Sequence, residues 1–479
     1  MTGLAAAAAV TLAIVTQDNA SLRAAPKADA AQHAQLLAGD LVEVRGERLD
    51  FLQVYDHRRE RAGYVRAAQV RAVAFTEAQA PQHLAVVRFL RDTPGAEALG
   101  IAYVAAYLKA APAPAIDAEP FDALGVMAER VARRASAPAA PKSATVALET
   151  VAQYGVRFSS FERNGSVRLC YDGEAFRRVL AQAASAEQQA RAALALTRAD
   201  CIDPALPVSE RLALNRWRGE TLDRIDARAF AALSEPARQR LHARRAAVWA
   251  TLAFDRSRTG EAPQAAARRA LDELAAIKRS ELSDDDSADY ADAALRVGAS
   301  RWAAQPPLAP AARLAISAQA GAEPGQTCVL LKDPKRSDAA ATLARRCTWG
   351  SVWVASARVA ADGRTAVLAV QALEAWTELW VFRAQRNGTW AIDVLPPAVA
   401  SEPGMGYIEF AGFVPGQQRL LVAREARVDG KRQRRFEVLK IDAGYAAERW
   451  ASEPQMLAAF SRWPDAAWKS GTVSLRDGR

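Results

Sequence analysis

The sequence predicts a multidomain α+β protein with a small N-terminal β-barrel, a central α-helical bundle and a C-terminal antiparallel β domain. Short alternating runs between turns fill the first 74 residues, helical apolar spacing fills the middle, and Trp-rich alternating runs fill the end. A length of 479 residues fits several domains, because one domain usually takes about 100–200 residues. The expected divisions are residues 1–10, 11–74, 75–150, 151–305, 306–325 and 326–479.

Composition excludes two classes of protein. Hydrophobic residues make up 51% of the chain and charged residues 24%, which is not the composition of a disordered chain. No apolar run reaches the roughly 18 residues of a membrane-spanning helix, so we expect no transmembrane segment. The net charge of +9 leaves open a partner that is nucleic acid or another anionic surface. Most basic residues are Arg scattered among acids, which equally fits a GC-rich genome, so we expect no specific nucleic acid.

Residues 1–10 are interpreted as the remnant of a signal peptide or as a disordered start. Leu4 to Val10 resemble the end of a secretory signal, with an Ala-x-Ala cleavage site near Ala7 to Ala9. The basic start and most of the apolar stretch of such a signal are missing, so the signal peptide is truncated in this interpretation. The alternative is the ordinary Ala-rich start of a cytoplasmic protein. We expect export to the periplasm or secretion.

The four cysteines fall into two local pairs, Cys170 with Cys201 and Cys328 with Cys347. None lies in a Cys-x-x-Cys motif, which zinc ribbons and thioredoxin-type redox sites require. We therefore expect two local disulfides, which persist in oxidising compartments. The alternative is four buried free thiols.

Residues 11–74 have the pattern of a small all-β barrel. Gly39 and Gly63 suit turns that need a positive φ angle. Alternation predicts that a set of apolar side chains points inward. The expected strands cover residues 11–16, 41–44, 51–55 and 63–65, and the expected core residues are Leu22, Val42, Val44, Val54 and Val65.

Four motifs in this segment resemble bacterial SH3-like domains. They are Asn19–Pro26, Leu37–Asp40 followed by Val42 and Val44, Phe51–Val54, and Ala62–Val65. The resemblance implies an SH3-like β-barrel that binds peptides, often those of the cell wall. Phe51 stands where the family usually has Trp, and residues 28–33 lengthen the first loop. These departures put the family's ligands in doubt for this chain.

Two tyrosines of this segment are candidate binding residues. Tyr55 and Tyr64 are placed to line a ligand groove of the barrel. The alternative is that both rings cover one end of its core.

Residues 75–305 are expected to be mainly helical. A β-hairpin is predicted over residues 151–172, with Asn164-Gly165 as its turn, and residues 135–142 are predicted to be a linker. Ser283 and the three Asp that follow it are interpreted as a helix start, because the Asp-x-Asp-x-Asp-Gly calcium loop is absent. The expected helices cover residues 82–92, 96–110, 121–134, 174–196, 209–223, 227–256, 263–280 and 288–304.

Residues 306–325 are expected to be a linker, and residues 326–479 a Trp-rich antiparallel β domain. Two stretches, 359–368 and 413–422, weakly resemble the turn between strands of β-propeller blades, so we expect blade-like sheets without a closed propeller. The expected strands cover residues 351–359, 365–371, 378–383, 390–395, 407–413, 419–424, 435–441 and 471–475.

Trp376, Trp463 and Trp468 are the binding candidates of the β domain. Trp376 follows a probable turn, and the other two flank Pro464 outside the expected strands. Aromatic side chains anchor interfaces at a low entropic cost, so an exposed surface formed by these three is one interpretation. The alternative is that they plug the open end of the domain.

Catalytic motifs are absent from the sequence. There is no His-Glu-x-x-His pair, no Gly-x-Ser-x-Gly elbow and no Walker or Gly-x-Gly-x-x-Gly loop. A Cys–His hydrolase would have to use Cys170 or Cys201 with His242, and two disulfides explain the cysteines better. We therefore expect no catalytic residues, no metal and no cofactor.

The sequence as a whole favours a non-enzymatic binding or scaffold protein of the cell envelope, which would bind a peptide, cell-wall material or an envelope protein. The first alternative is a cell-wall hydrolase or its accessory subunit. The second is a cytoplasmic basic protein associated with nucleic acid.

Overall fold

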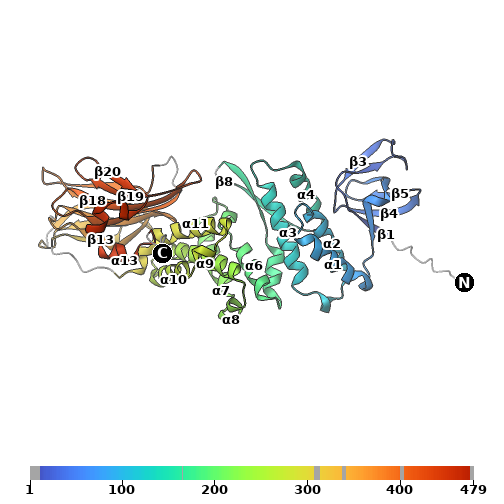
Figure 1. Ribbon diagram of the computed structural model, residues 1–479, viewed down its shortest axis with the longest axis horizontal. Helices are drawn as coiled ribbons and strands as arrows, with labels where there is room; N and C mark the ends of the chain where they lie inside the picture. Colours follow the sequence, from blue (N-terminus) through green and yellow to red (C-terminus); the bar gives the residue numbers. More distant parts are fainter. Residues whose placement is uncertain (1–10, 164, 307–312, 337–340, 400–403, 475–479) are drawn as a thin grey trace. The chain divides into compact units, whose positions relative to one another are not determined.

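The computed structural model describes residues 11–163, 165–306, 313–336, 341–399 and 404–474 (Figure 1). The interpretation of residues 1–10 therefore lies outside the described residues. The fold is α+β, with an N-terminal sheet, central helices and C-terminal antiparallel sheets, as predicted. The chain forms two compact units. The first contains residues up to Pro207 together with Ile225–Leu233, and the second contains Val208–Arg224 and the chain from Ser234.

The N-terminal sheet has seven antiparallel strands in the order β3-β2-β6-β5-β4-β1-β7. Its hydrogen-bonded order ends at β3 and β7, so among the described residues the sheet does not close into the expected barrel. Three of its strands, β2, β3 and β7, were not predicted. The strands are β1 Thr11–Val15, β2 Ala20–Arg23, β3 Gln32–Leu36, β4 Leu41–Arg48, β5 Phe51–Asp56, β6 Arg61–Arg66 and β7 Val70–Val73.

The inner face of this sheet forms its own core. Leu22, Val42, Val54 and Val65 are fully buried there, and Val44 packs against them half-buried, so the predicted inward set is confirmed. Alternation along each strand places these side chains on one face.

The two glycines of the sheet have different roles. Gly39 has the expected positive φ of 97°, and a Cβ there would also lie 2.7 Å from the carbonyl oxygen of Ala98. The expectation for Gly63 is wrong, because Gly63 is not among the residues with positive φ. A Cβ on Gly63 would lie 2.7 Å from Leu22 Cγ and 2.8 Å from the carbonyl oxygen of Arg23. Close approach of β2, rather than backbone conformation, therefore requires this glycine.

The helices of the first unit pack on one end of the N-terminal sheet. Ile14 of β1 and Val73 of β7 share a core with α1, α2 and α3. The predicted linker ends sooner than expected, since α4 begins at Lys142. The hairpin β8–β9 forms as predicted, with φ +69° at Gly165, while Asn164 lies outside the described residues. The elements are α1 Ala80–Arg91, α2 Glu97–Ala110, α3 Glu119–Ala135, α4 Lys142–Ala152, β8 Phe158–Arg163, β9 Ser166–Tyr171, α5 Glu174–Ala181, α6 Ala186–Leu196 and α8 Ala227–Ala231.

Two predicted long helices are each broken at a serine. The expected helix 174–196 divides because Ser185 and Gln188 form a reciprocal capping box that starts α6. The expected helix 227–256 divides at Ser234, after which α9 begins with Glu235-Pro236. A cap and a first-turn proline favour a new start over continuation, and both signals are visible in the sequence.

The second unit begins with a helical layer. α9 packs against α7, α10 and α11 and ends at Gly260, whose φ is +78°. Ser283 caps α11 as predicted, accepting a hydrogen bond from the backbone N–H of Asp286. The helices are α7 Val208–Asp223, α9 Glu235–Thr259, α10 Gln264–Ala275 and α11 Asp284–Ser300.

The β part of the second unit contains two four-stranded antiparallel meanders, β13-β14-β15-β16 and β17-β18-β19-β20, linked by a short parallel pairing of β15 with β17. A separate three-stranded sheet, β10-β11-β12, precedes them. The expected strand 471–475 is wrong over the residues that the structure describes, because Gly471 ends α13 and residues 472–474 are not in a strand, while Leu475 lies outside the described residues. The elements are β10 Ala315–Ala320, β11 Thr327–Lys332, β12 Thr342–Thr348, β13 Ser351–Val359, β14 Thr365–Leu373, β15 Trp376–Ala384, β16 Trp390–Leu395, β17 Met405–Phe413, β18 Arg419–Val428, β19 Lys431–Lys440, β20 Ala446–Ala451, α12 Ala458–Arg462 and α13 Ala466–Gly471.

Three buried layers hold these sheets together. Leu331 and Leu368 belong to a core between the three-stranded sheet and the first meander. Val381 and Ile408 belong to a core between the two meanders. Phe436 belongs to a third core, between the second meander and the C-terminal helices. The first meander is therefore covered on both of its faces. This explains why β14 has a continuous apolar run instead of alternating apolar and polar residues.

Candidate binding face and disulfides

Tyr55 and Tyr64 lie on one face of the N-terminal sheet. In the register of β5 and β6, Tyr55 stands opposite Ala62 and Tyr64 opposite Gln53. Residues directly opposite each other in an antiparallel pair share a face, and the diagonal neighbours lie about 7–8 Å apart. The structure therefore brings together the two tyrosines that the sequence singled out.

Arginines are interleaved with the aromatic rings of this face. The Arg45 guanidinium lies 4.1 Å from the centroid of the Tyr55 ring, and that of Arg66 lies 5.5 Å from the centroid of Phe51. Guanidinium groups stack on aromatic faces because their charge is delocalised and weakly hydrated. We call the surface formed by Arg45, Tyr55, Tyr64 and Arg66, with the buried Phe51 ring beneath Arg66, the aromatic face.

A carboxylate organises the neighbourhood of Tyr55. Arg45 donates a hydrogen bond of 3.0 Å to Glu43, and His57 Nε2 lies 2.6 Å from the same carboxylate. The hydrogen bonds from Arg45 and His57 lower the pKa of Glu43. The His57 ring stands edge-on to Tyr55, with 4.8 Å between the ring centroids. Glu43 therefore holds two cationic or hydrogen-bonding groups beside the tyrosine ring.

The core that the helices share with the sheet does not include the residues of the aromatic face, while α4 reaches the neighbouring β5–β6 turn through the ion pair of Arg58 with Glu149. Those helices pack on Leu12 and Ile14 of β1, at the other end of the sheet, whereas Val54 and Val65 of β5 and β6 belong to the sheet's own core. Tyr55 and Tyr64 are half-buried, while Val54 and Val65 are fully buried. The tyrosine rings thus retain exposed surface.

The three Trp candidates of the β domain separate. Trp463 is 43% exposed, but Trp376 is 4% and Trp468 1% exposed. The expectation of one exposed surface formed by all three is therefore corrected. Trp376 begins β15 and packs against Ala426 and Val428 of the neighbouring meander. The Trp468 ring packs edge-to-face against Phe436 and Phe460, as the plug interpretation required.

Trp468 also belongs to a buried polar cluster. Its Nε1 donates a hydrogen bond of 2.8 Å to Glu409 of β17, and the same carboxylate accepts one from Thr472. Arg301 forms an ion pair with Glu409, and both side chains are nearly fully buried. The cluster joins α13 to the sheet and to the end of α11, which is a structural role.

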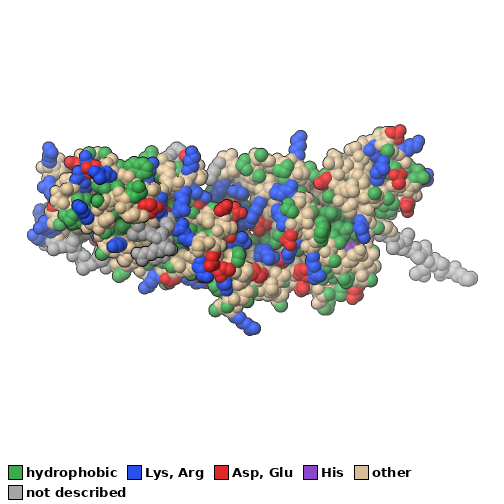
Figure 2. All heavy atoms as spheres, in the orientation of Figure 1, with side chains coloured by type: hydrophobic (Ala, Val, Ile, Leu, Met, Phe, Trp, Pro, Cys, Tyr) green, Lys and Arg blue, Asp and Glu red, His purple; other side chains and the backbone are tan. Residues whose placement is uncertain are grey.

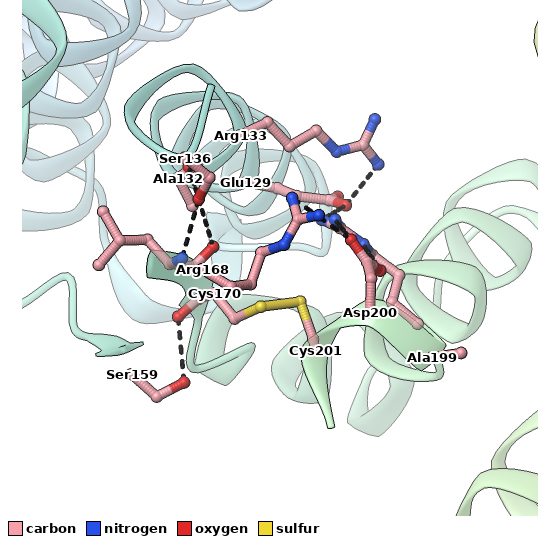
Figure 3. Close-up of a disulfide and its surroundings, with 12 residues drawn as sticks. Glu129, Ala132, Arg133, Ser136, Ser159, Arg168, Cys170, Ala199, Asp200 and Cys201 are labelled. Atoms are coloured by element: carbon pink, nitrogen blue, oxygen red, sulfur yellow. Dashed lines mark hydrogen bonds and ion pairs between the residues drawn. A yellow bond between two sulfur atoms is a disulfide. The ribbon is translucent and has the colours of Figure 1, made fainter. Parts of the chain in front are cut away.

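Cys170 and Cys201 form the first predicted disulfide, with 5.7 Å between the Cα atoms. It connects the end of β9 to the short 3-10 helix Ala199–Cys201, and Figure 3 shows its polar surroundings. Ser136 accepts a hydrogen bond from the backbone N–H of Leu169, beside the bridge. The disulfide therefore lies where the hairpin meets α3.

Cys328 and Cys347 form the second predicted disulfide. They stand opposite each other on β11 and β12. Both expected pairings are confirmed, and no described cysteine is free. Two disulfides indicate an oxidising compartment.

The disulfides also remove the Cys–His hydrolase arrangement. Catalysis needs a thiolate, and the sulfurs of Cys170 and Cys201 are bonded to each other. His242 Nδ1 instead lies 2.6 Å from Glu273. Within the described residues there is no group of three or more His, Cys, Asp or Glu side chains arranged to hold a metal ion.

Charge is distributed rather than gathered on the visible surface. Figure 2 shows Lys and Arg side chains interspersed with Asp and Glu. The Lys431–Arg435 cluster forms the start of β19, directly after the Asp429-Gly430 turn. Among the helices that the structure describes, none is long and apolar enough to cross a membrane.

Comparisons with protein-family models, with curated proteins and with solved structures find no match to this chain. Sequence reasoning missed Glu43, Arg45 and His57 as neighbours of Tyr55. The available signal was the register of β4 against β5, in which Glu43 stands opposite Tyr55.

Proposed function

We propose that the chain is a non-enzymatic binding protein of the periplasm or the extracellular space. Its N-terminal sheet is an SH3-like module that binds peptides bearing carboxylates, those of the cell wall included, through the aromatic face. The observation that carries this proposal is the interleaving of Phe51, Tyr55 and Tyr64 with Arg45 and Arg66 on a face that the helices of the same unit leave open.

The chemistry of the aromatic face suits an extended acidic peptide. Tyrosine rings offer large contact area with few rotatable bonds, so little entropy is lost when a ligand binds. The Nε and Nη2 donors of Arg45 already bind Glu43, and Arg66 Nη1 lies 3.5 Å from Asp50, so each arginine offers a ligand carboxylate its remaining N–H donors. The cation–π contacts of Arg45 and Arg66 hold both guanidiniums near the rings before any ligand arrives. Preorganisation of this kind lowers the cost of binding.

The compartment in the proposal rests on the two disulfides together with the Ala-rich start. Disulfides persist in the periplasm and the extracellular space but not in the reducing cytosol. Cell-wall peptides are found in the same oxidising compartments. Leu4 to Val10 are the end of a secretory signal in this account.

The C-terminal meanders are blade-like in the same proposal. Each meander has its first turn at a glycine with φ +69°, Gly363 between β13 and β14 and Gly416 between β17 and β18. The turns stand at equivalent places in two four-stranded units, which supports an internal repeat. We assign this part a scaffold role.

The test is co-sedimentation of the intact, oxidised chain with purified cell wall. The double variant Tyr55→Ala/Tyr64→Ala is expected to bind at least about tenfold more weakly, because truncation of aromatic anchors commonly costs an interface more than about 1.4 kcal/mol. Phe89→Ala is the matched control, since Phe89 is a 75% exposed aromatic residue on α1, outside the aromatic face. The control is expected to bind like the wild type.

Two further measurements on the same protein separate the hydrolase and the nucleic-acid alternatives. Release of soluble fragments from the cell wall would identify a hydrolase and contradict the proposal. Strong binding to duplex DNA with a steep dependence on salt would indicate a nucleic-acid partner instead. Equal binding by the wild type and the double tyrosine variant, with unchanged melting temperatures, would remove the aromatic face as the site.

A further inference from the structure

A cavity of about 220 Å³ lies between α7 and α9 in the second unit, apart from the aromatic face. Its apolar wall comes from Leu212, Trp249 and Leu252. A Cβ on Gly219 of α7 would lie 2.9 Å from Leu252 Cδ1, so the helices approach closely at that glycine. The charged residues at the cavity are Arg216, Glu220, Asp223, Asp255, Arg256 and Glu261.

Four of these six charged residues are acids, and ion pairs neutralise only two of them. Asp223 pairs with Arg269 of α10, and Glu261 pairs with Arg216 at 3.9 Å. The guanidinium of Arg256 lies over the Trp249 ring, 5.7 Å from its centroid. The carboxylates of Glu220 and Asp255 form no ion pair within the described residues. Arg269 also lies over the Trp249 ring, 4.3 Å from its centroid, so the negative charge left without an ion pair is that of Glu220 and Asp255.

Asp255 is the inner carboxylate of the cavity. Its Oδ2 accepts a hydrogen bond of 2.9 Å from the neutral amide of Asn215, whose own Oδ1 accepts one from Arg218. Arg211 and Arg218 of α7 and Glu374 of the β14–β15 turn are the charged groups around it. Burial, the largest influence, raises the pKa of Asp255 to about 6.

The apolar wall also contains an unmatched donor. Trp249 Nε1 is buried and finds no hydrogen-bond acceptor within the described residues. Buried polar groups in folded proteins are normally hydrogen-bonded, so such a donor requires an explanation. A water molecule in the cavity would supply the acceptor, because an ammonium group has donors only.

We infer that this cavity binds a small aliphatic amine, with its ammonium group against Asp255 and its carbon stem against Leu212 and Leu252. The ammonium group supplies the positive counter-charge that Asp255 lacks, and the carbon stem covers the apolar wall. The cavity has the volume of roughly seven molecules of liquid water, which is enough for a short stem. The amine is either a free small molecule or the side chain of a lysine in a peptide.

Isothermal titration of the oxidised full-length chain with n-pentylamine at pH 7.5 tests this inference. Pentanoate, which has a stem of similar length but the opposite charge, is the matched control ligand. Pentylammonium is expected to bind at least tenfold more tightly than pentanoate. Nα-acetyl-lysine amide is titrated in parallel, and tighter binding of this compound assigns the site to lysine side chains.

The matched variants are Asp255→Asn and Asp272→Asn. The first removes the charge of the inner carboxylate and keeps its shape, and it is expected to weaken pentylammonium binding at least tenfold. Asp272 is exposed on α10, outside the cavity, so its variant removes the same charge from the unit and is expected to bind normally. If Asp255→Asn does not fold, the wild-type comparison of pentylammonium with pentanoate still decides the question.

The affinity is also expected to depend on pH. Aliphatic amines stay protonated below pH 9, so the change comes from Asp255, which loses its proton near pH 6. Binding should weaken about tenfold between pH 7.5 and pH 5. Equal affinity for pentylammonium and pentanoate, no binding of any amine at millimolar concentration, or full binding by folded Asp255→Asn would each overturn the inference.

Discussion

Two carboxylates of the second unit, the buried Glu409 and the half-buried Asp255, have opposite environments. Glu409 has a direct arginine partner and two further donors, from Trp468 and Thr472. Asp255 has one neutral amide donor and a raised pKa. A buried charge that is paired contributes to the fold, whereas a buried charge without a close partner is typical of a site that takes a ligand.

Removing the charge of Asp255 is expected to stabilise the protein. The pKa of about 6 in the folded chain lies above the ordinary 3.8, so folding keeps a proton that the unfolded chain has already lost. The stability associated with this group is fully present below about pH 4 and is lost as pH rises through 6. The melting temperature of Asp255→Asn should therefore exceed that of the wild type by a few degrees at pH 7.5 and match it at pH 4. A lower melting temperature at pH 7.5 would contradict this.

Removing the charge of Glu409, in contrast, is expected to destabilise the protein. Glu409→Gln leaves Arg301 buried without its counter-ion, which typically costs about 3–5 kcal/mol. The free energy of unfolding in urea measures this loss. Glu448→Gln is the control, because Glu448 pairs with Arg419 near the surface, and exposed pairs contribute at most about 1 kcal/mol. Equal losses in the two variants would show that the buried cluster has no special role.

Residue-level prediction from the sequence succeeded for the cysteines and failed for two tryptophans. Local spacing was enough to pair the cysteines, since each partner lies within 31 residues. The burial of Trp468 depends on Glu409, 59 residues away, and on the rings of Phe436 and Phe460. No local pattern encodes such contacts.

The elements of the N-terminal sheet allow a direct test of its register. Val54 of β5 is fully buried and stands opposite Gly63 of β6. Val54→Ala removes two methyl groups from this core and leaves a cavity, at a cost of roughly 1–3 kcal/mol. Urea unfolding of the intact chain, monitored in the first unit by hydrogen exchange, measures the change. An unchanged midpoint would mean that Val54 does not face the core.

The first disulfide fixes one hairpin to one helical connection. Replacing Cys170 and Cys201 with Ser is expected to lower stability by about 3–4 kcal/mol, from the chain entropy of a loop with a sequence separation of 31. Peptide mapping without reduction should find only the pairs Cys170–Cys201 and Cys328–Cys347 in oxidised protein. Crossed pairs or four free thiols would contradict the structure.

Most elements were predictable because their signals are local. Outside the β8–β9 hairpin, alternation and turn residues predicted eleven strands of the present structure in nearly their observed places, and helical spacing predicted most helices. The missed breaks at Ser185 and Ser234 are caps that compete with helix continuation. β20 was missed because its exposed residues have no apolar alternation, and its pairing with β19 defines it.

At the scale of the whole molecule, the order of β, α and β parts followed from the sequence, whereas the grouping of the helices did not. The sequence suggested a separate helical domain over residues 151–305. The structure instead places α7 and α9–α11 in one compact unit with the β part. Thr251 and Arg296 both donate hydrogen bonds to Glu374, and Thr377 donates one to the carbonyl oxygen of Ala299. These pairs lie 78 or more residues apart, so packing alone reveals them.

Of the two candidate sites, one has a local signal in the sequence and the other does not. Tyr55 and Tyr64 were identified from motifs within a short segment. The cavity was not, because it needs α7 and α9 to be adjacent and Gly219 to face Leu252. A site that forms from two helices leaves no contiguous signature in the chain.

We propose that the ligand lies on the aromatic face, and crosslinking locates a bound ligand without relying on a loss of affinity. A photo-reactive phenylalanine at Ala62, which is exposed and stands opposite Tyr55, would be irradiated with purified cell-wall peptides. The same group at Phe89 on α1 is the control. A peptide adduct is expected from position 62 and none from position 89. Equal adducts from both positions, or none from position 62 under conditions where the chain pellets with cell wall, would contradict the proposal.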